Sequence, residues 1–240
     1  MTAKASDPAH VMAIDEALLA HAAEARRPEA MLRLYRWALP TLSIGAKLEL
    51  PSDVARRCRR AGVAIVRRPT GGGAVLHDRD LTYAVVAPSG SRGVLETYRW
   101  VAGGLIGGLG MLGLEARVMQ HGGPSRALAC FAVPTGADLE VGGRKICGSA
   151  QVRRLGWFLQ HGSIPLVDLR RRTRELLGIE DETSTCLELE LPGVIWQDLS
   201  RSLTLGFEQL WSEVPRVRGL SLRERELVEE CLHDPLAGGG

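Results

Sequence analysis

Residues 66–78 read VRRPTGGGAVLHD and place three consecutive glycines between two apolar segments. Gly71, Gly72 and Gly73 let the backbone approach a ligand closely and adopt positive φ. Their N–H groups can form an anion-binding nest, beside which Arg67 and Arg68 offer planar donors for phosphate or carboxylate. A hairpin turn with two solvated arginines is the simpler alternative. No GK[ST] follows, so the stretch is not a phosphate-binding P-loop.

The periodicity on either side predicts both helices and strands. Apolar residues at helical spacing predict a helix over 8–24, with Asp15 and Glu16 facing water. Alternating runs predict strands over 31–37, 41–46, 63–70 and 114–119, a hairpin over 74–78 and 81–88, and three antiparallel strands over 138–143, 145–154 and 157–166. Further helices are predicted over 53–61, 93–113, 171–178, 197–213 and 221–233. The expected fold is α+β, a mixed, mainly antiparallel sheet flanked by helices, in one domain over 1–240.

Composition excludes several classes of protein. The 240 residues are 45% hydrophobic and 24% charged, which is typical of a globular chain. Thirty basic against 28 acidic side chains argue against a nucleic-acid binder. The five cysteines form no CxxC pair, which argues against a zinc ribbon. The sequence contains no signal peptide and no apolar run long enough for a membrane span, so we expect a soluble cytoplasmic protein without metal or membrane partner.

Two further segments carry side chains suited to chemistry. GGRKICGSAQ, residues 142–151, contains Lys145, one of three lysines in the chain. Gly148, Ser149 and Ala150 follow it and leave room for a thin ligand across the strand. A lone lysine on a strand is more often solvated. In WFLQHGSIPL, residues 157–166, His161 is either a general base or a hydrogen-bonded strand residue.

RRPTGGGAVLHDRDLTY, GGRKICGSAQ and LQHGSIPL, together with MAIDEALL and TLSIGA, resemble the lipoate-protein ligase A / biotin-protein ligase superfamily. The resemblance covers residues 8–213 and is closest to the branch that octanoylates lipoyl domains. It implies an acyl chain bound beside the glycine loop, with Lys145 holding the acyl carbonyl or the adenylate. The positions it implies for substrate binding are Arg67, Arg68, Thr70, Gly71, Gly72, Gly73, His77, Gly148, Ser149, Ala150, His161 and Gly162.

A transferase of this branch needs a cysteine thiolate beside a cation. Cys130 lies in ACFAVP, which resembles the loop that carries the nucleophile in one transferase type. Cys147 is the alternative, because side chains two apart on a regular strand share a face and Lys145 is two residues away. A reaction without a cysteine nucleophile is the third possibility. We expect Cys130 to be the nucleophile.

The resemblance implies octanoyl transfer from acyl carrier protein to a lipoyl domain or glycine-cleavage H protein, without metal or nucleotide. The alternatives are an ATP-dependent lipoate ligase with a separate accessory protein, an octanoyl amidotransferase between lipoyl domains, and a non-catalytic carrier-binding module. Only about 27 residues follow Glu213, too few for an accessory domain, which favours the transferase. Arginine clusters lie at 56–60, 67–68, 153–154 and 170–174, and we expect one or more of them to steer the acidic carrier protein and lipoyl domain. A solvated helix face is the alternative for the cluster at 56–60.

Overall fold

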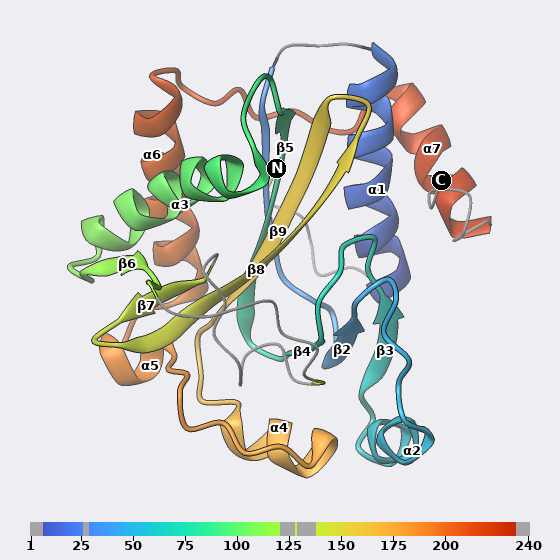
Figure 1. Cartoon of the computed structure of the whole chain (residues 1–240), viewed down its shortest axis with the longest axis vertical. Helices are drawn as coiled ribbons and strands as arrows, with labels where there is room; N and C mark the ends of the chain where they lie inside the picture. The colour runs from blue at the N-terminus through green and yellow to red at the C-terminus, as the bar shows by residue number, and fades with distance from the viewer. Residues whose placement is uncertain (1–6, 26–28, 121–127, 129–137, 234–240) are drawn as a thin grey trace.

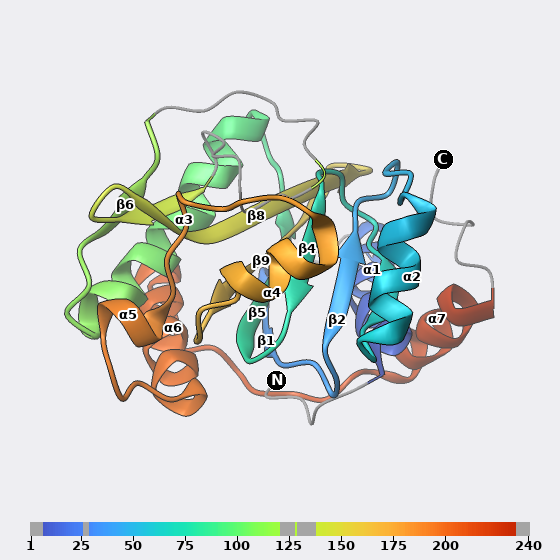
Figure 2. The same cartoon turned by 90° about the horizontal axis from the view of Figure 1, so that it is seen from below.

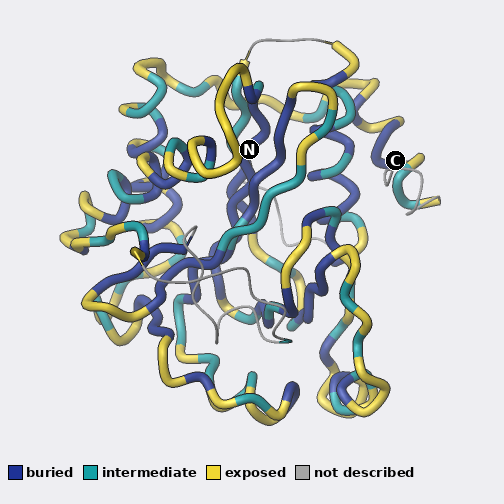
Figure 3. The backbone as a smooth tube through the Cα atoms, viewed as in Figure 1, coloured by how far each residue is buried: buried dark blue, intermediate teal, exposed yellow. Residues whose placement is uncertain are grey.

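The computed structural model of this chain describes residues 7–25, 29–120, 128 and 138–233. At its centre is a six-stranded antiparallel sheet in the order β1-β5-β9-β8-β7-β6 (Figure 1). Its strands are β1 (Met31–Tyr35), β5 (Asp80–Pro88), β6 (Ala116–Val118), β7 (Leu139–Val141), β8 (Arg144–Arg154) and β9 (Trp157–Pro165). β5 and β9 are buried over almost their whole length (Figure 3), because helices cover both faces of the sheet.

Two layers of helices enclose this sheet. One face packs against α1 (Pro8–Ala25), and α7 (Leu222–His233) packs on the outer side of α1. The opposite face packs against α3 (Val94–Met111) and α6 (Trp196–Trp211), with the short α5 (Leu187–Glu190) beside them. Figure 1 shows the two helix pairs on opposite sides of the long strands β8 and β9. None of the helices in the described ranges is long and apolar enough to cross a bilayer.

A second, three-stranded sheet carries the glycine loop. β2 (Thr41–Ile44) lies between β3 (Ala64–Arg67), which is parallel to it, and β4 (Ala74–His77), which is antiparallel. Its apolar residues pack with Val54 and Cys58 of α2 (Ser52–Arg60) and with Leu176 and Leu177 at the end of α4 (Arg170–Leu177). Figure 2 shows α2 on the outer side of β2. The glycine loop connects β3 to β4 at one end of this sheet.

The predicted hairpin over residues 74–88 is wrong. β4 pairs with β2 in the small sheet, whereas β5 pairs with β1 and β9 in the large one. The chain changes sheets at Arg79, whose φ is 59°. β5 has nine residues, almost all of them buried, and it pairs along its length with β1 on one edge and β9 on the other. A hairpin with β4, which has only four residues, would leave part of β5 without a paired neighbour.

The expected α+β class with flanking helices is confirmed, and the second sheet is an addition to it. The water-facing position expected for Asp15 is wrong, because its side chain is fully buried. Its surroundings are described with the site below.

Glycines allow α3 and α6 to cross in backbone contact. A Cβ on Gly206 of α6 would lie 2.3 Å from the Gly104 carbonyl oxygen and 2.4 Å from the Gly108 nitrogen. Both neighbours are helix backbone, which cannot move aside without separating the two helices. The glycines in this otherwise apolar pair of helices therefore fix the helix spacing.

We predict that Gly206→Ala lowers the free energy of unfolding by about 1–3 kcal/mol, the usual effect of overpacking a core. Gly110→Ala, also in α3, is the matched control, because a Cβ there meets nothing within 4 Å. Its expected effect is a gain of about 0.5–1 kcal/mol from helix propensity. Chemical denaturation measures both variants, and equal effects would contradict the packing described.

Candidate active site

The predicted site residues meet in a pocket at the junction of the two sheets. β2 and β4, with Arg68 directly after β3, supply one wall, and β5, β8 and β9 supply the other. Of the predicted residues, the pocket is lined by Arg68, His77, Gly148, Ser149, Ala150, His161 and Gly162. It is also lined by Met12, Tyr35, Trp37, Ser43, Val75, Thr82 and Ser163. Arg67, Thr70, Gly71, Gly72 and Gly73 do not line it but build the adjoining loop.

The two arginines of the motif hold two adjoining segments, Arg68 the glycine loop and Arg67 the segment directly after β2. Arg68 is buried, and its Nη2 donates to the Gly71 and Gly73 carbonyl oxygens at 2.7 and 2.8 Å. Arg67 is exposed, and its Nη1 donates to the carbonyl oxygens of Gly45, Ala46 and Leu48. The sequence suggested that these two guanidinium groups bind an anion. Their contacts with backbone carbonyl oxygens instead indicate that they hold the backbone in place.

The loop requires glycine at two positions that face each other. Gly72 has φ of 91°, in the region that favours glycine. Its carbonyl oxygen would lie 2.1 Å from a Cβ on Gly45, the residue directly after β2. Gly45 was not predicted as a site residue, although the sequence IGA at the end of a predicted strand indicated a close backbone approach.

A buried carboxylate organises the side of the pocket formed by α1. Asp15 is fully buried and accepts hydrogen bonds from Arg33 Nη1 at 2.5 Å and from Tyr35 at 2.9 Å. It also lies 3.2 Å from His161 Nδ1. Because a carboxylate only accepts, Nδ1 carries the ring hydrogen and Nε2 accepts the hydroxyl proton of Thr70 at 2.6 Å.

Charge and burial oppose each other in this network. Burial by itself raises the pKa of Asp15, but the Arg33 guanidinium and the hydrogen bond from His161 outweigh it and lower the pKa below its usual value. For His161, burial lowers the pKa, and the nearby Asp15 only partly offsets this effect. His161 is therefore neutral at pH 7, with one donating and one accepting nitrogen.

A second histidine occupies the opposite wall in a similar arrangement. His77 Nδ1 lies 2.7 Å from Asp80 Oδ2, and its Nε2 lies 2.9 Å from Ser43 Oγ. The Trp37 ring stacks on the His77 imidazole with 4.4 Å between the ring centroids, and Trp37 Nε1 donates a hydrogen bond to Thr82 Oγ1. The wall is thus rigid, with its polar atoms bonded to one another.

Lys145 lies beside the pocket rather than in its lining. The side chain is fully buried, and Nζ pairs with Asp138 Oδ2 at 2.8 Å. The other oxygen of Asp138 accepts from the Ser149 N–H at 3.4 Å. Asp138 therefore ties the lysine to the small residues at Gly148–Ala150. The solvated position usual for a strand lysine does not apply here.

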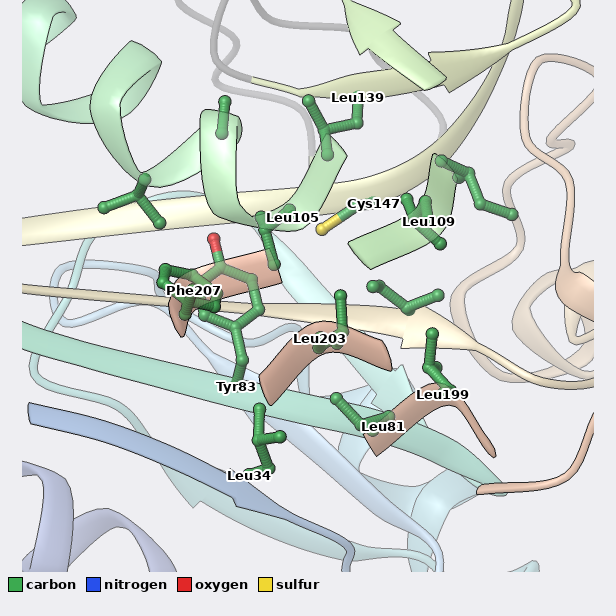
Figure 4. Close-up of a cluster of buried hydrophobic side chains, with 14 of the residues drawn as sticks. Leu34, Leu81, Tyr83, Leu105, Leu109, Leu139, Cys147, Leu199, Leu203 and Phe207 are labelled. Atoms are coloured by element: carbon green, nitrogen blue, oxygen red, sulfur yellow. The ribbon is translucent and has the colours of Figure 1, made fainter. Parts of the chain in front are cut away.

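The structure weakens the case for Cys147 as a nucleophile. The β7–β8 register shifts between Leu139↔Cys147 and Glu140↔Lys145, and this irregularity breaks the alternation on which the same-face argument relied. Figure 4 shows the thiol among Leu105, Leu109 and Leu139 of the core. Burial raises the pKa of Cys147 to about 12, so at neutral pH it is a thiol.

Burial also raises the pKa of the other three described cysteines, which are Cys58, Cys186 and Cys231. Cys130 lies outside the described residues. The nearest described residues around it are Leu128, whose carbonyl oxygen accepts from the Ala74 N–H at 2.5 Å, and Asp138. Leu128 therefore contacts the start of β4 beside the glycine loop, and Asp138 contacts Lys145. Within the described ranges, no group of His, Cys, Asp or Glu is arranged to hold a metal ion.

Comparison with known proteins agrees with this geometry. The model of the lipoyl protein ligase A/B catalytic domain matches residues 7–184. The chain belongs to this family. Octanoyltransferase LipM of Carboxydothermus hydrogenoformans is 39% identical to it, over 93% of this chain and 90% of that protein. Octanoyltransferase LipM of Geobacillus kaustophilus is 37% identical, over 93% and 89%.

Solved lipoyl protein ligase structures have the same fold. A bipartite lipoate protein ligase from Thermoplasma acidophilum superposes with a TM-score of 0.77 at 21% identity, over 98% of this chain and 90% of that one. Lipoate-protein ligase A bound with ATP gives 0.79 at 23% identity, over 98% and 92%. The superfamily and the fold predicted from the motifs are therefore confirmed.

Sequence reasoning missed the partners that position the predicted side chains. Asp15 was predicted on the solvated face of its helix, and no site role was predicted for Ser43, Asp80 or Asp138, although all four are buried. An acidic residue inside MAIDEALL was a usable signal for Asp15. Asp138 gave none, because its pairing with Lys145 depends on how β7 and β8 meet.

We predict that the free energy of unfolding falls as the pH drops below about 6.5. Burial lowers the pKa of His161 in the folded state. In that pH range the imidazole of His161 therefore binds a proton in the unfolded state but not in the folded state. One such group contributes up to about 1.4 kcal/mol per pH unit. Denaturation between pH 5 and 7 should show a smaller slope for His161→Gln, whereas the exposed control His233→Gln keeps the wild-type slope. An unchanged slope in His161→Gln would rule out this origin.

Proposed function

We propose that this octanoyltransferase takes its acyl group from octanoyl acyl carrier protein and passes it to a lysine of a lipoyl domain or glycine-cleavage H protein, through a thioester on Cys130. The single observation that carries the proposal is the buried Lys145–Asp138 ion pair. It fixes an ammonium group beside Gly148–Ala150 and at the end of the chain segment that holds Cys130. A thiolate nucleophile needs such a neighbour.

Chain connectivity supports a nucleophile at residue 130. Leu128 is hydrogen-bonded to Ala74 at the end of the glycine loop. Cys130 follows Leu128 by only two residues in the sequence. The raised pKa of the four described thiols, Cys147 among them, leaves none of these as an activated thiolate.

The reaction proceeds in two acyl transfers. The Cys130 thiol loses its proton, and the thiolate attacks the thioester carbonyl of the carrier. A new C–S bond forms, the C–S bond to the carrier breaks, and the proton given up by Cys130 is taken up by the carrier sulfur. The neutral amine of the acceptor lysine then attacks the enzyme thioester. A C–N bond forms, the C–S bond breaks, and the proton lost by the amine returns to the sulfur. In both steps the Lys145 ammonium stabilises negative charge on the acyl oxygen.

Several residues that line the pocket would offer carbon surface to an acyl chain. Gly148, Ala150 and Gly162 present little side chain, and a Cβ on Gly162 would lie 2.4 Å from the Gly148 carbonyl oxygen. The polar atoms of His77 and His161 are engaged with Asp80 and Asp15, respectively. Their rings therefore offer carbon surface to an octanoyl chain. We propose that the substrate lies across these residues.

The test of the proposal is intact mass after mixing the protein with octanoyl carrier protein without ATP. Wild type should gain one octanoyl group, Cys130→Ala should gain none, and the matched control Cys147→Ala should gain one. An adduct that survives in Cys130→Ala and disappears in Cys147→Ala would move the nucleophile into the core. An adduct that forms only from an octanoylated H protein would establish the amidotransferase. Activity only with free lipoate and ATP would establish the ligase.

A second prediction concerns the ammonium group. Changing Lys145 alone would leave Asp138 buried without its charged partner, a large destabilisation in its own right. The double change Lys145→Met with Asp138→Asn avoids this, and it should fold while slowing octanoyl-enzyme formation by about 10²–10³. Rapid-quench mass spectrometry gives the rate, and circular dichroism checks the fold. A wild-type rate would exclude Lys145 from the reaction.

A further inference from the structure

The two arginine clusters that lie on helices, at 56–60 and 170–174, differ in how far they are neutralised. In the cluster at 170–174, each arginine of α4 has a carboxylate partner: Arg170 pairs with Asp168, Arg171 with Glu175, Arg172 with Asp78 and Arg174 with Glu180. Residues 168–182 contain four arginines and five acidic residues. This cluster is internally neutralised and offers little attraction to a partner.

The cluster at 56–60 keeps its charge. Arg57 pairs with Asp53, but Arg56, Arg59 and Arg60 form no ion pair with any described residue. These three residues are exposed and recur at the i, i+3, i+4 spacing that places side chains on one helix face. The outer face of α2 therefore carries three guanidinium groups without a local counter-charge.

The surrounding segment extends this positive surface to the glycine loop. Residues 45–67 hold six basic and two acidic side chains, a net charge of +4, whereas the whole chain carries only +2. Arg67, at the end of β3, binds carbonyl oxygens only in its described contacts and is exposed. We call residues 45–67 the α2 surface.

The α2 surface lies close to the candidate active site. The buried residues of α2, Val54 and Cys58, pack in the same cluster as Ala74 and Leu128, the two residues that join the glycine loop to the segment of Cys130. The outer face is thus about one helix diameter, roughly 10 Å, from that junction. Figure 2 shows α2 unobstructed on the outside of β2.

We propose that the α2 surface is the docking site for the acidic acyl carrier that donates the octanoyl group. The inference rests on the proposed function. The carrier presents its acyl group on a phosphopantetheine arm, whose phosphodiester adds negative charge at the point of contact. The acceptor instead presents a lysine side chain and brings no phosphodiester to the point of contact. Charge complementarity therefore assigns Arg56, Arg59 and Arg60 to the donor.

The experiment compares Arg56→Gln/Arg59→Gln/Arg60→Gln with a control of equal charge change, Arg170→Gln/Arg171→Gln/Arg174→Gln on α4. Each is assayed for octanoyl-enzyme formation from octanoyl carrier protein and from the octanoyl thioester of N-acetylcysteamine, a small uncharged donor. The α2 variant should lose about tenfold or more in kcat/KM with the carrier, within the range of electrostatic steering, and nothing with the small donor. Its rate should also lose most of its salt dependence.

The outcomes separate this inference from the proposed function. Equal losses in the α2 and α4 variants, or none in either, would overturn the docking site while octanoyl-enzyme formation stands. A loss confined to transfer onto the lipoyl domain would assign the surface to the acceptor and also overturn it. Failure of wild type to form an octanoyl-enzyme from either donor would overturn the proposed function itself. Thermal unfolding of both variants excludes a folding defect.

Discussion

The site depends on a buried carboxylate. Asp15 has no exposed surface, and it joins α1 to β1 through Arg33 and Tyr35 and to β9 through His161. An isolated carboxylate at this depth would be costly, so each of these partners is held in place by the need to compensate its charge. The histidine extends the network to the glycine loop through Thr70. One side chain thereby fixes a helix, two strands and a loop relative to one another.

The candidate active site is consequently assembled from two sheets on either side of the pocket. The small sheet supplies the glycine loop and His77, and the large sheet supplies Gly148–Ala150 and His161. The two histidines are each held by a carboxylate and a hydroxyl, so neither is free to rotate. Lys145 stands beside the pocket as a fixed positive charge. Such preorganisation is the main means by which enzymes stabilise charge that develops during acyl transfer.

Much of this could be predicted from the sequence, and the failures have physical causes. Glycine motifs and period-two alternation located the loop, β8 and β9, because those signals are local. Asp15 was placed on the wrong face, since helical periodicity reports polarity and not the buried arginine on another element that compensates it. The hairpin over 74–88 failed because the choice between two sheets is a long-range matter. The same-face argument for Cys147 assumes a regular strand, and the register shift between β7 and β8 beside Cys147 is an irregularity that a sequence pattern does not reveal.

The central claim is that the octanoyl group passes through an enzyme thioester that is competent for transfer. The most direct measurement isolates the octanoyl-enzyme, freed of carrier and nucleotide, and mixes it with an unmodified lipoyl domain. The account predicts that the octanoyl group moves to the domain lysine at a rate no slower than overall turnover, leaving unmodified enzyme. An octanoyl-enzyme that persists, loses its acyl group only to water, or needs ATP for transfer would contradict the account.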